Sequence, residues 1–507
     1  MLTDRRTLLR AGLAAGGIVM ATRSLAQGQN ATLRVGVDKF PATLVPSRAT
    51  DQTGSSMMLQ MHSRLLKLSV KGELVPGLAE SWKPDGDTAW LFALRDAKFS
   101  DGSRVTAEDV RWSFERLANA SVGSNLRPFF QQIEAVEPID ARTVRVKTNG
   151  TDASLPYLAA TQGALILKRS DDPAQEIGIG AGPFILKSQE QGVALNFVRN
   201  PHYYEAGFPK FENLRITVVN DENLRVTALL SGDVDFINFI PWQSMSEIER
   251  NPRVTLLESP TGAFNYLTFS GKGPFADVRL RKAVAFGLRR EEFVKAVFYG
   301  RGKPLEGPPR VIGSPYYHED AANHFRYNPG LSKSLMREAG VADGFNCTLL
   351  AASDYAMHRD SGVLVKTQLA ELGIRVNLVL NDFTTRQAMG NKGVGDMGIN
   401  GTGIETPDPG GIQRVVDPSL GVATMRSHSF EVPGLAELYA RAKAELDPAI
   451  AVEIYRKADG LTNEYASFCG LCYRSNGFAF RNELKGFELL PAGASVTSMC
   501  NLYKVSM

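Results

Sequence analysis

The sequence predicts an α/β protein built from more than one domain. Its 507 residues are 43% hydrophobic and 22% charged, which is an ordinary globular composition, and the length allows two to four domains with a large core. Patterns typical of strands and helices alternate along the chain. At residues 342–380 a strand, a helix and a second strand follow one another, which favours a parallel strand pair.

The first 26 residues have the pattern of an export signal. Arg5 and Arg6 precede an apolar stretch of 11 residues, 11–21, and small residues end the segment at Ala26. A membrane-spanning helix needs about 20 apolar residues, so this stretch is too short to be one. The segment resembles a twin-arginine (Tat) signal peptide cleaved near Ala26, and no cysteine follows to carry a lipid. We therefore expect a periplasmic protein.

The remainder of the chain carries no net charge. The whole sequence has 57 basic and 54 acidic side chains, and the first 26 residues hold four arginines and one aspartate, which leaves 53 of each sign. The net charge of +3 therefore belongs to the signal segment. Nucleic-acid binding has no electrostatic support, and we expect no nucleic-acid partner.

The elements of the mature chain can be placed in order. Alternating residues predict strands early in the chain, and Thr106 predicts the start of a helix, with Asp109 as its capping-box partner and Val110, Phe114 and Leu117 on its buried face. The predicted strands cover residues 32–37, 88–95, 141–148, 184–199 as a hairpin, 214–220, 264–270, 342–353, 374–380, 477–480 and 484–490. Further helices are predicted after Asp277, through 363–372, and as a hairpin over 435–465 that breaks at Pro448.

The cysteines and histidines leave their roles open. Cys469 and Cys472 form a CxxC pair that invites a redox or metal interpretation, but the surroundings are aromatic and no second pair follows. A structural disulfide and inert buried thiols are the alternatives for these and for Cys347 and Cys500. The histidines show no metal-site spacing, although His358 or His428 could meet a metal chelate. We expect no cofactor, no resident metal and no catalytic residue.

Several segments, in this order, resemble family-five solute-binding proteins of ABC transporters, the peptide/nickel-binding group. They are LVPGLAESW, LRDAKFSDGSRVTAEDVRWSFERL, GAGPF, RNPHYY, SGDVDF, GPFADVRLRKAVAFGL, ADGF and LAELGIRV. Together they span nearly the whole mature chain. The resemblance implies a periplasmic-binding-protein-like α/β fold, with two lobes around a hinge and an extra subdomain in the first lobe.

The resemblance also implies domain boundaries and partners. The first lobe would comprise residues 27–50, 176–264 and 474–507, with the extra subdomain at 51–175 and the second lobe at 265–473. The chain would cross between the lobes near Asn265 and Tyr473. We expect a monomer that binds a small-molecule ligand and delivers it to an ABC transporter permease in the membrane.

The stretch NGTGIETPDPGG carries the main site hypothesis. Peptide-binding members of the family hold the ligand's ammonium group with an acid before a DP pair, and this position corresponds to Glu405, where the family usually has Asp. Thr402 stands where the family commonly has Trp. Glu405 would contact a ligand amine or hydroxyl, or would be an exposed loop acid, while Asp408 would cap the following segment. Further candidate contacts, each with a core or surface role as the alternative, are Trp242, Phe264, Asn265, Tyr266 and, for a ligand carboxylate, Arg359.

Two other functions remain open at this point. The Tat-type signal is also found on exported enzymes and redox proteins, although the sequence shows no nucleophile elbow, haem motif, P-loop or metal cluster. A ligand-binding sensor that serves a membrane receptor would have the same sequence features as a transport component.

Overall fold

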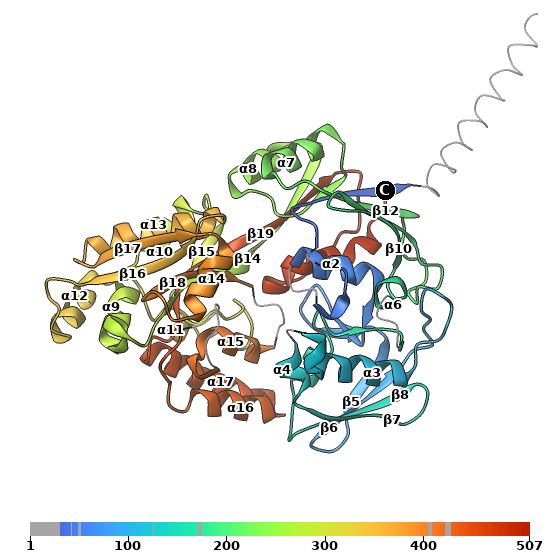
Figure 1. Cartoon of the computed structure of the whole chain (residues 1–507), viewed down its shortest axis with the longest axis horizontal. Helices are drawn as coiled ribbons and strands as arrows, with labels where there is room; N and C mark the ends of the chain where they lie inside the picture. Colours follow the sequence, from blue (N-terminus) through green and yellow to red (C-terminus); the bar gives the residue numbers. More distant parts are fainter. Residues whose placement is uncertain are drawn as a thin grey trace, which may run out of the picture.

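The computed structural model describes residues 31–41, 43–48, 52–124, 126–170, 175–403, 408–420 and 427–507. The predicted signal peptide and Glu405 lie outside these residues. Within them, no helix combines the length and hydrophobicity that crossing a membrane requires. Two groups of elements lie side by side, joined by the long strands β14 (Val254–Phe269) and β19 (Cys469–Arg481) (Figure 1).

The first lobe is built on one end of a large mixed sheet. Strand β1 pairs in parallel with β12 and β13, while the β10–β11 hairpin continues the sheet outward. Leu33, Val35 and Val37 of β1 are fully buried, and this strand is the one predicted at 32–37. The elements are β1 (Thr32–Val37), η1 (Pro46–Arg48), α2 (Gln52–Met61), α6 (Gln175–Gly178), β10 (Phe184–Glu190), β11 (Ala194–Arg199), β12 (Asn213–Val218), α7 (Glu222–Ser231), β13 (Phe236–Ile237), α8 (Trp242–Arg250) and η6 (Ala492–Lys504).

The extra subdomain has its own sheet, in the order β5-β6-β8-β7. Helix α3 packs on it and begins as predicted, because the Asp109 carboxylate accepts hydrogen bonds from the Thr106 backbone N–H at 2.8 Å and from its hydroxyl at 2.7 Å. Its predicted inner face is buried. The elements are β2 (Ser63–Arg64), β3 (Leu66–Leu68), β4 (Leu74–Pro76), β5 (Ala79–Pro84), β6 (Ala89–Leu94), α3 (Ala107–Ala118), η2 (Ala120–Val122), α4 (Arg127–Phe130), β7 (Ile133–Pro138), β8 (Thr143–Thr148), α5 (Leu155–Leu158) and β9 (Leu165–Ile166).

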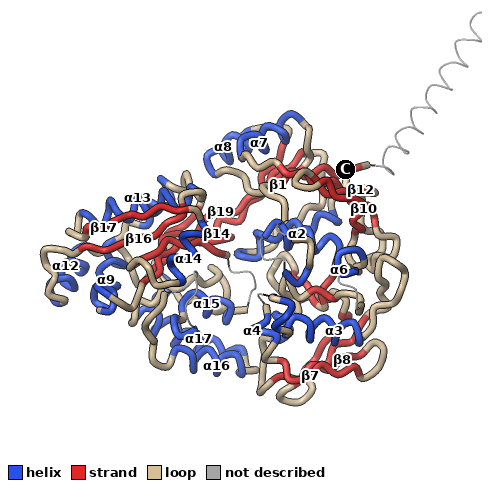
Figure 2. The backbone as a smooth tube through the Cα atoms, viewed as in Figure 1, coloured by secondary structure: helices blue, strands red, loops and turns tan. Residues whose placement is uncertain are grey.

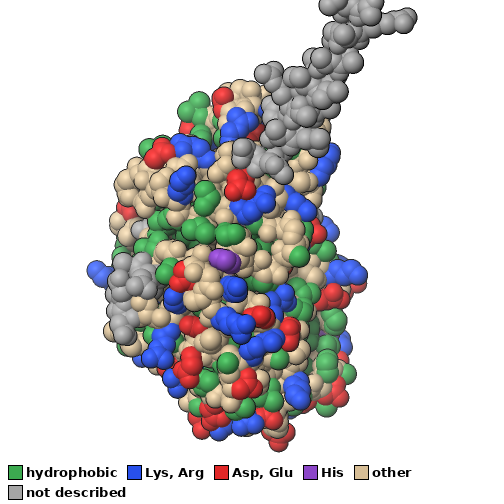
Figure 3. Space-filling model, turned by 90° about the vertical axis from the view of Figure 1, so that its right-hand side faces the viewer, with side chains coloured by type: hydrophobic (Ala, Val, Ile, Leu, Met, Phe, Trp, Pro, Cys, Tyr) green, Lys and Arg blue, Asp and Glu red, His purple; other side chains and the backbone are tan. Residues whose placement is uncertain are grey.

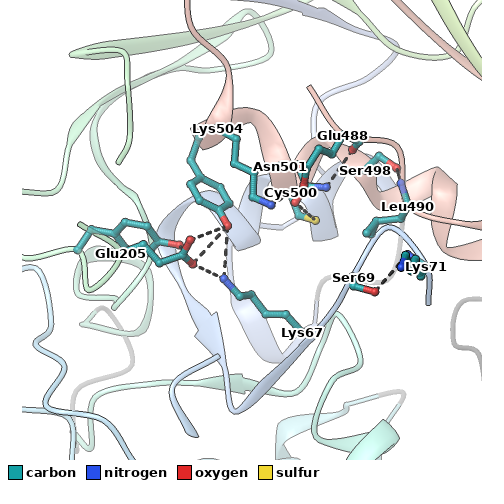
Figure 4. A network of polar contacts seen from close by, with 12 residues as sticks. Lys67, Ser69, Lys71, Glu205, Glu488, Leu490, Ser498, Cys500, Asn501 and Lys504 are labelled. Atoms are coloured by element: carbon teal, nitrogen blue, oxygen red, sulfur yellow. Dashed lines mark hydrogen bonds and ion pairs between the residues drawn. The ribbon is translucent and has the colours of Figure 1, made fainter. Parts of the chain in front are cut away.

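A polar network fixes this subdomain to the first lobe. Lys67 of β3 forms an ion pair with Glu205, which also accepts a hydrogen bond from the Tyr503 hydroxyl at 3.1 Å (Figure 4). Tyr203 donates to the same carboxylate at 2.9 Å. The three partners come from different parts of the chain, so the network has a structural role in joining them.

The second lobe contains the parallel pair predicted from the sequence. Strands β16 and β17 pair in parallel, and helix α13 connects them. The predicted helical hairpin also forms, with α17 beginning at Pro448, where proline is tolerated. The elements are η3 (Gly273–Ala276), α9 (Val278–Gly287), α10 (Arg290–Ala296), β15 (Gly302–Pro304), α11 (Glu319–Ala322), α12 (Pro329–Glu338), β16 (Asn346–Ala352), α13 (Ala356–Ala370), β17 (Arg375–Asn381), α14 (Phe383–Asn391), β18 (Met397–Thr402), η4 (Pro409–Ile412), α15 (Gln413–Val416), η5 (Pro418–Leu420), α16 (Leu435–Ala444) and α17 (Pro448–Glu464).

One sheet runs through both lobes (Figure 2). Its order is β10-β11-β12-β1-β13-β19-β14-β18-β16-β17, with β15 beside β19. The two predicted crossing points are direct neighbours, since Asn265 pairs with Cys472 and Phe264 with Tyr473. The boundaries predicted between the lobes and the subdomain remain predictions. The strand predicted at 484–490 is not formed, because this segment makes only a single bridge, between Lys485 and Ser506.

The surface shows no segregation of charge on the face seen in Figure 3. Acidic and basic side chains are interspersed there, as expected for a mature chain with equal numbers of each.

Candidate functional site

The aromatic residues Phe264 and Tyr266 are packed in a core. Both lie on β14 and are at most 1% exposed. Their rings are 5.6 Å apart, and the Tyr266 ring stacks on Phe468 at 5.1 Å. The cluster around them includes residues of α15, α16 and α17. This packing fits the core role that was the alternative for both residues, and their ligand contact remains a prediction.

Thr402 ends strand β18 immediately before the segment that would carry the ligand-binding acid. It is buried, and its hydroxyl donates a long hydrogen bond of 3.4 Å to the Gly403 carbonyl. On the other side of that segment Asp408 caps η4, with its carboxylate accepting from the Gly410 N–H at 2.9 Å. This is the capping role predicted for Asp408. Glu405 itself lies outside the described residues, so its contact with a ligand stays a prediction.

Trp242 contributes to the junction of the two lobes. It is the first residue of α8, and its indole N–H donates to the Ser475 carbonyl on β19 at 3.0 Å. Its ring meets Phe298 edge to face at 4.9 Å. The side chain of Arg474 lies over the same ring, at 5.9 Å from the ring centre. Trp242 is thus held beside the strands where the chain crosses between lobes.

Arg359 faces solvent, whereas the preceding residue faces inward. The Arg359 guanidinium pairs with Asp360 at 2.8 Å, and both side chains are 46% exposed. His358, one residue earlier on α13, is 3% exposed. Arg359 therefore does not gather with the other candidate residues in this structure, and His358 does, because its ring lies beside Asn265.

Asn265 and His358 approach each other across Gly401. Asn265 is fully buried on β14 and pairs with Gly401 on β18. A side chain at 401 would place its Cβ 2.9 Å from Asn265 Oδ1 and 3.1 Å from His358 Nε2. Glycine is therefore required at this position if both polar groups are to keep their places. Neither that oxygen nor either ring nitrogen of His358 has a hydrogen-bond partner among the described residues.

Two buried arginines act on His358. The pKa of the His358 imidazole is lowered to about 3, mainly by burial and also by the positive charges of Arg386 and Arg474. The ring is therefore neutral at any physiological pH. Arg474 was missed by the sequence analysis. The signal that could have found it is that it is the single charged residue in the run CGLCYRSNGFAF.

The loop at Asp408 is anchored by a buried ion pair. Arg310 and Asp459 meet at 2.7 Å, with side chains 3% and 1% exposed, and Arg310 also donates to the Pro409 carbonyl. Burial raises the pKa of the Asp408 carboxyl to about 6. This acid is therefore partly protonated near neutral pH.

The two lobes also touch outside β14 and β19. Asp152 of the extra subdomain pairs with Lys443 at the end of α16 at 2.9 Å. The Ala153 N–H donates to the Lys443 carbonyl, also at 2.9 Å.

The cysteine alternatives are narrowed by the structure. All four thiols are free and buried. Burial raises the pKa of the Cys469 thiol to about 11 and that of Cys472 still higher, so neither is a reactive thiolate at neutral pH. Within the described residues, no three His, Cys, Asp or Glu side chains gather as a metal site would need.

Comparison with known proteins decides the family. A model of the bacterial extracellular solute-binding proteins, family 5, matches residues 73–416. The chain belongs to this family. The resemblance inferred from the sequence and the periplasmic-binding-protein-like fold are confirmed. Members of this family bind substrates for ABC importers, so the chain is a substrate-binding protein and the enzyme alternative does not hold.

Three similar proteins illustrate the match. The probable D,D-dipeptide-binding periplasmic protein DdpA of Escherichia coli K12 is 27% identical over 480 residues, covering 90% of this chain and 92% of that protein. The structure of AgaA from A. tumefaciens R10 in complex with agropinic acid is 28% identical, with a TM-score of 0.83 and coverage of 94% and 98%. MoaA from the same source, in complex with mannopinic acid, is 25% identical, with a TM-score of 0.77 and coverage of 94% and 99%.

Proposed function

We propose that this protein is the periplasmic component of an ABC importer that captures a small organic solute, a peptide or another amine-bearing compound, between two lobes. The observation that carries the proposal is the pairing of β14 and β19 at Asn265 and Cys472, where the chain passes twice between the lobes. Two adjacent strands can bend together, so this pairing suits a hinge. The related proteins that bind a D,D-dipeptide, agropinic acid and mannopinic acid support a solute of this size class.

Lobe closure is part of the same proposal. The contact between Asp152 of the extra subdomain and Lys443 at the end of α16 would form or break as the lobes move. A solute held between the lobes would stabilise this contact, and the face formed on closure would be recognised by the permease. The N-terminal segment would direct the protein to the periplasm and be removed near Ala26.

Glu405 is the proposed ligand for the amine. It lies three residues before Asp408, at the position where peptide-binding members of the family carry an acid. Glu405→Gln keeps the size of the side chain and removes its charge. Loss of a charged hydrogen bond costs about 1.5–3 kcal/mol, or roughly tenfold to a hundredfold in affinity.

The test begins with native mass spectrometry of the protein together with its co-purified solute. Calorimetric titration of that compound into the wild type and Glu405→Gln then measures the loss of affinity, with Glu437→Gln, an exposed acid on α16, as the control. An unchanged affinity in Glu405→Gln, or a co-purified neutral sugar, would rule out the amine contact. Small-angle X-ray scattering with and without the compound tests whether the lobes close.

A further inference from the structure

Arg474 is a buried arginine whose guanidinium is not fully hydrogen-bonded by the described part of the chain. It lies in β19, is 7% exposed, and its Nε has no hydrogen-bond acceptor. Burial lowers the pKa of Arg474 to about 10, and no Asp or Glu among the described residues opposes this effect. A buried charge without compensation is costly, so a fold that retains one has a reason for it.

Three other buried arginines of the described residues are compensated. Arg290, 1% exposed, donates to four backbone carbonyls at 2.7–3.3 Å. Arg225, equally buried, donates to three at 2.6–3.1 Å. Arg310 has the Asp459 carboxylate. Arg474 differs from these because its Nε has no hydrogen-bond acceptor among the described residues and its guanidinium lies over the face of the Trp242 ring.

Unpartnered polar atoms surround Arg474 on one face of the crossing strands. Ala263 pairs with Arg474 and Asn265 with Cys472, so the side chains of Asn265 and Arg474 point to the same side. Asn476, two residues after Arg474, shares that side, and its Nδ2 is buried without a partner. Together with Asn265 Oδ1 and the His358 ring, these atoms form a group of hydrogen-bonding sites that the protein itself leaves unused.

The electrostatics of this group favour an anion. His358 experiences the positive charges of both Arg474 and Arg386. Arg386 makes a single side-chain hydrogen bond, to the Ile399 carbonyl at 2.7 Å, and its Nε is also unpartnered. No described carboxylate acts on either arginine. Two cations that both act on a neutral imidazole, without a described carboxylate to oppose them, create a local positive potential.

We propose that Arg474, with His358 and Asn476, binds a carboxylate of the transported solute, and that Arg386 strengthens the site by its charge. The guanidinium supplies paired N–H donors that match a carboxylate, and the neutral imidazole and the Asn476 amide supply further donors. The inference rests on the proposed function. In the sequence Glu405 follows Thr402, the last residue of the strand that carries Gly401, by three residues. If Glu405 holds an amine of the same solute, the solute would be a zwitterion such as an amino-acid derivative.

The experiment compares acids with their methyl esters. Agropinic acid, mannopinic acid and L-alanyl-L-alanine, each against its carboxyl methyl ester, are titrated by calorimetry into the wild type and Arg474→Gln. We expect the wild type to bind the acid at least tenfold more tightly than the ester, and this preference to fall to about one in Arg474→Gln. Arg474→Lys, which keeps the charge, should retain part of it.

Two controls separate binding from folding. Arg456→Gln removes an exposed arginine already paired with Asp320 and should leave the preference intact. Thermal unfolding of each variant confirms that it is folded, and Asn476→Ala provides a second, uncharged change in the same group. Equal binding of acid and ester by the wild type, or a preference preserved in Arg474→Gln, overturns the carboxylate site while leaving solute capture intact. Absence of binding for every acid and ester by folded wild type counts against both proposals.

Discussion

Replacement of Asp408 by asparagine should stabilise the protein at neutral pH, and the gain in stability over the wild type should be smaller at acidic pH. The substitution keeps an oxygen that accepts from the Gly410 N–H and removes a charge that burial disfavours. The pKa of Asp408 in the folded protein is about 6, against the ordinary value of 3.8 in the unfolded chain. Because the native value is raised, the stability gained by protonation is fully present below pH 3.8 and is lost as pH rises through 6.

The size of the effect follows from the two pKa values. Their difference of about 2 corresponds to a penalty of up to about 3 kcal/mol at pH 7.5 and about 1 kcal/mol at pH 4.5. The groups that act on this carboxyl include Asp152, which raises its pKa, and Lys443 and Arg310, which lower it. Asp408→Asn should therefore unfold above the wild type at pH 7.5, by a margin that narrows toward pH 4.5.

Differential scanning calorimetry at several pH values, in matched buffers, measures this margin. Asp447→Asn is the matched control, because Asp447 also caps a helix through a side-chain oxygen but is exposed. A margin that is the same at pH 7.5 and pH 4.5, or a less stable Asp408→Asn at pH 7.5, would refute the reasoning. Either result would mean that this carboxyl is ionised in the folded protein without cost.

Two further substitutions probe the ion pairs around this loop. Lys443→Ala removes the contact with Asp152 between the lobes, and because the lysine side chain is 41% exposed, affinity for the co-purified solute should fall by only about fivefold. Calorimetry measures this affinity, with the exposed Lys457→Ala as the control. An unchanged affinity would argue against a role of the contact in closure. Asp459→Asn leaves the Arg310 guanidinium buried without its carboxylate, which should lower the free energy of unfolding by about 3–5 kcal/mol and lower the unfolding temperature. The apolar double variant Arg310→Met/Asp459→Leu should recover most of this loss. A double variant no more stable than Asp459→Asn would contradict this account.

Local features of this protein could be predicted from the sequence because neighbouring residues determine them. The capping box of Thr106 and Asp109 needs only two side chains three residues apart. The turn chemistry around Asp408 is equally local, and its cap on η4 forms as expected. The family resemblance, carried by short motifs spread over the chain, was sufficient for the fold and the class of function.

The ligand-facing side of individual residues could not be predicted in this way. Arg359 was the arginine chosen for a carboxylate, yet it faces solvent, and its neighbour His358 faces inward. A helix pattern with a weak apolar face does not fix which of two adjacent residues points toward the sheet. That choice depends on how α13 packs against β16 and β18.

The sequence by itself determined most of the elements and the family, and the segment that would hold a ligand amine stays a prediction from it. Only the tertiary structure decided that Arg474 lies beside Asn265 and His358, residues distant in sequence. Alternation along β19 shows which of its residues share a face, but which strand lies next to it depends on the sheet order, where β14 is placed between β19 and β18. Contacts of this kind join residues that are far apart in the sequence, and no local pattern of residues can therefore predict them.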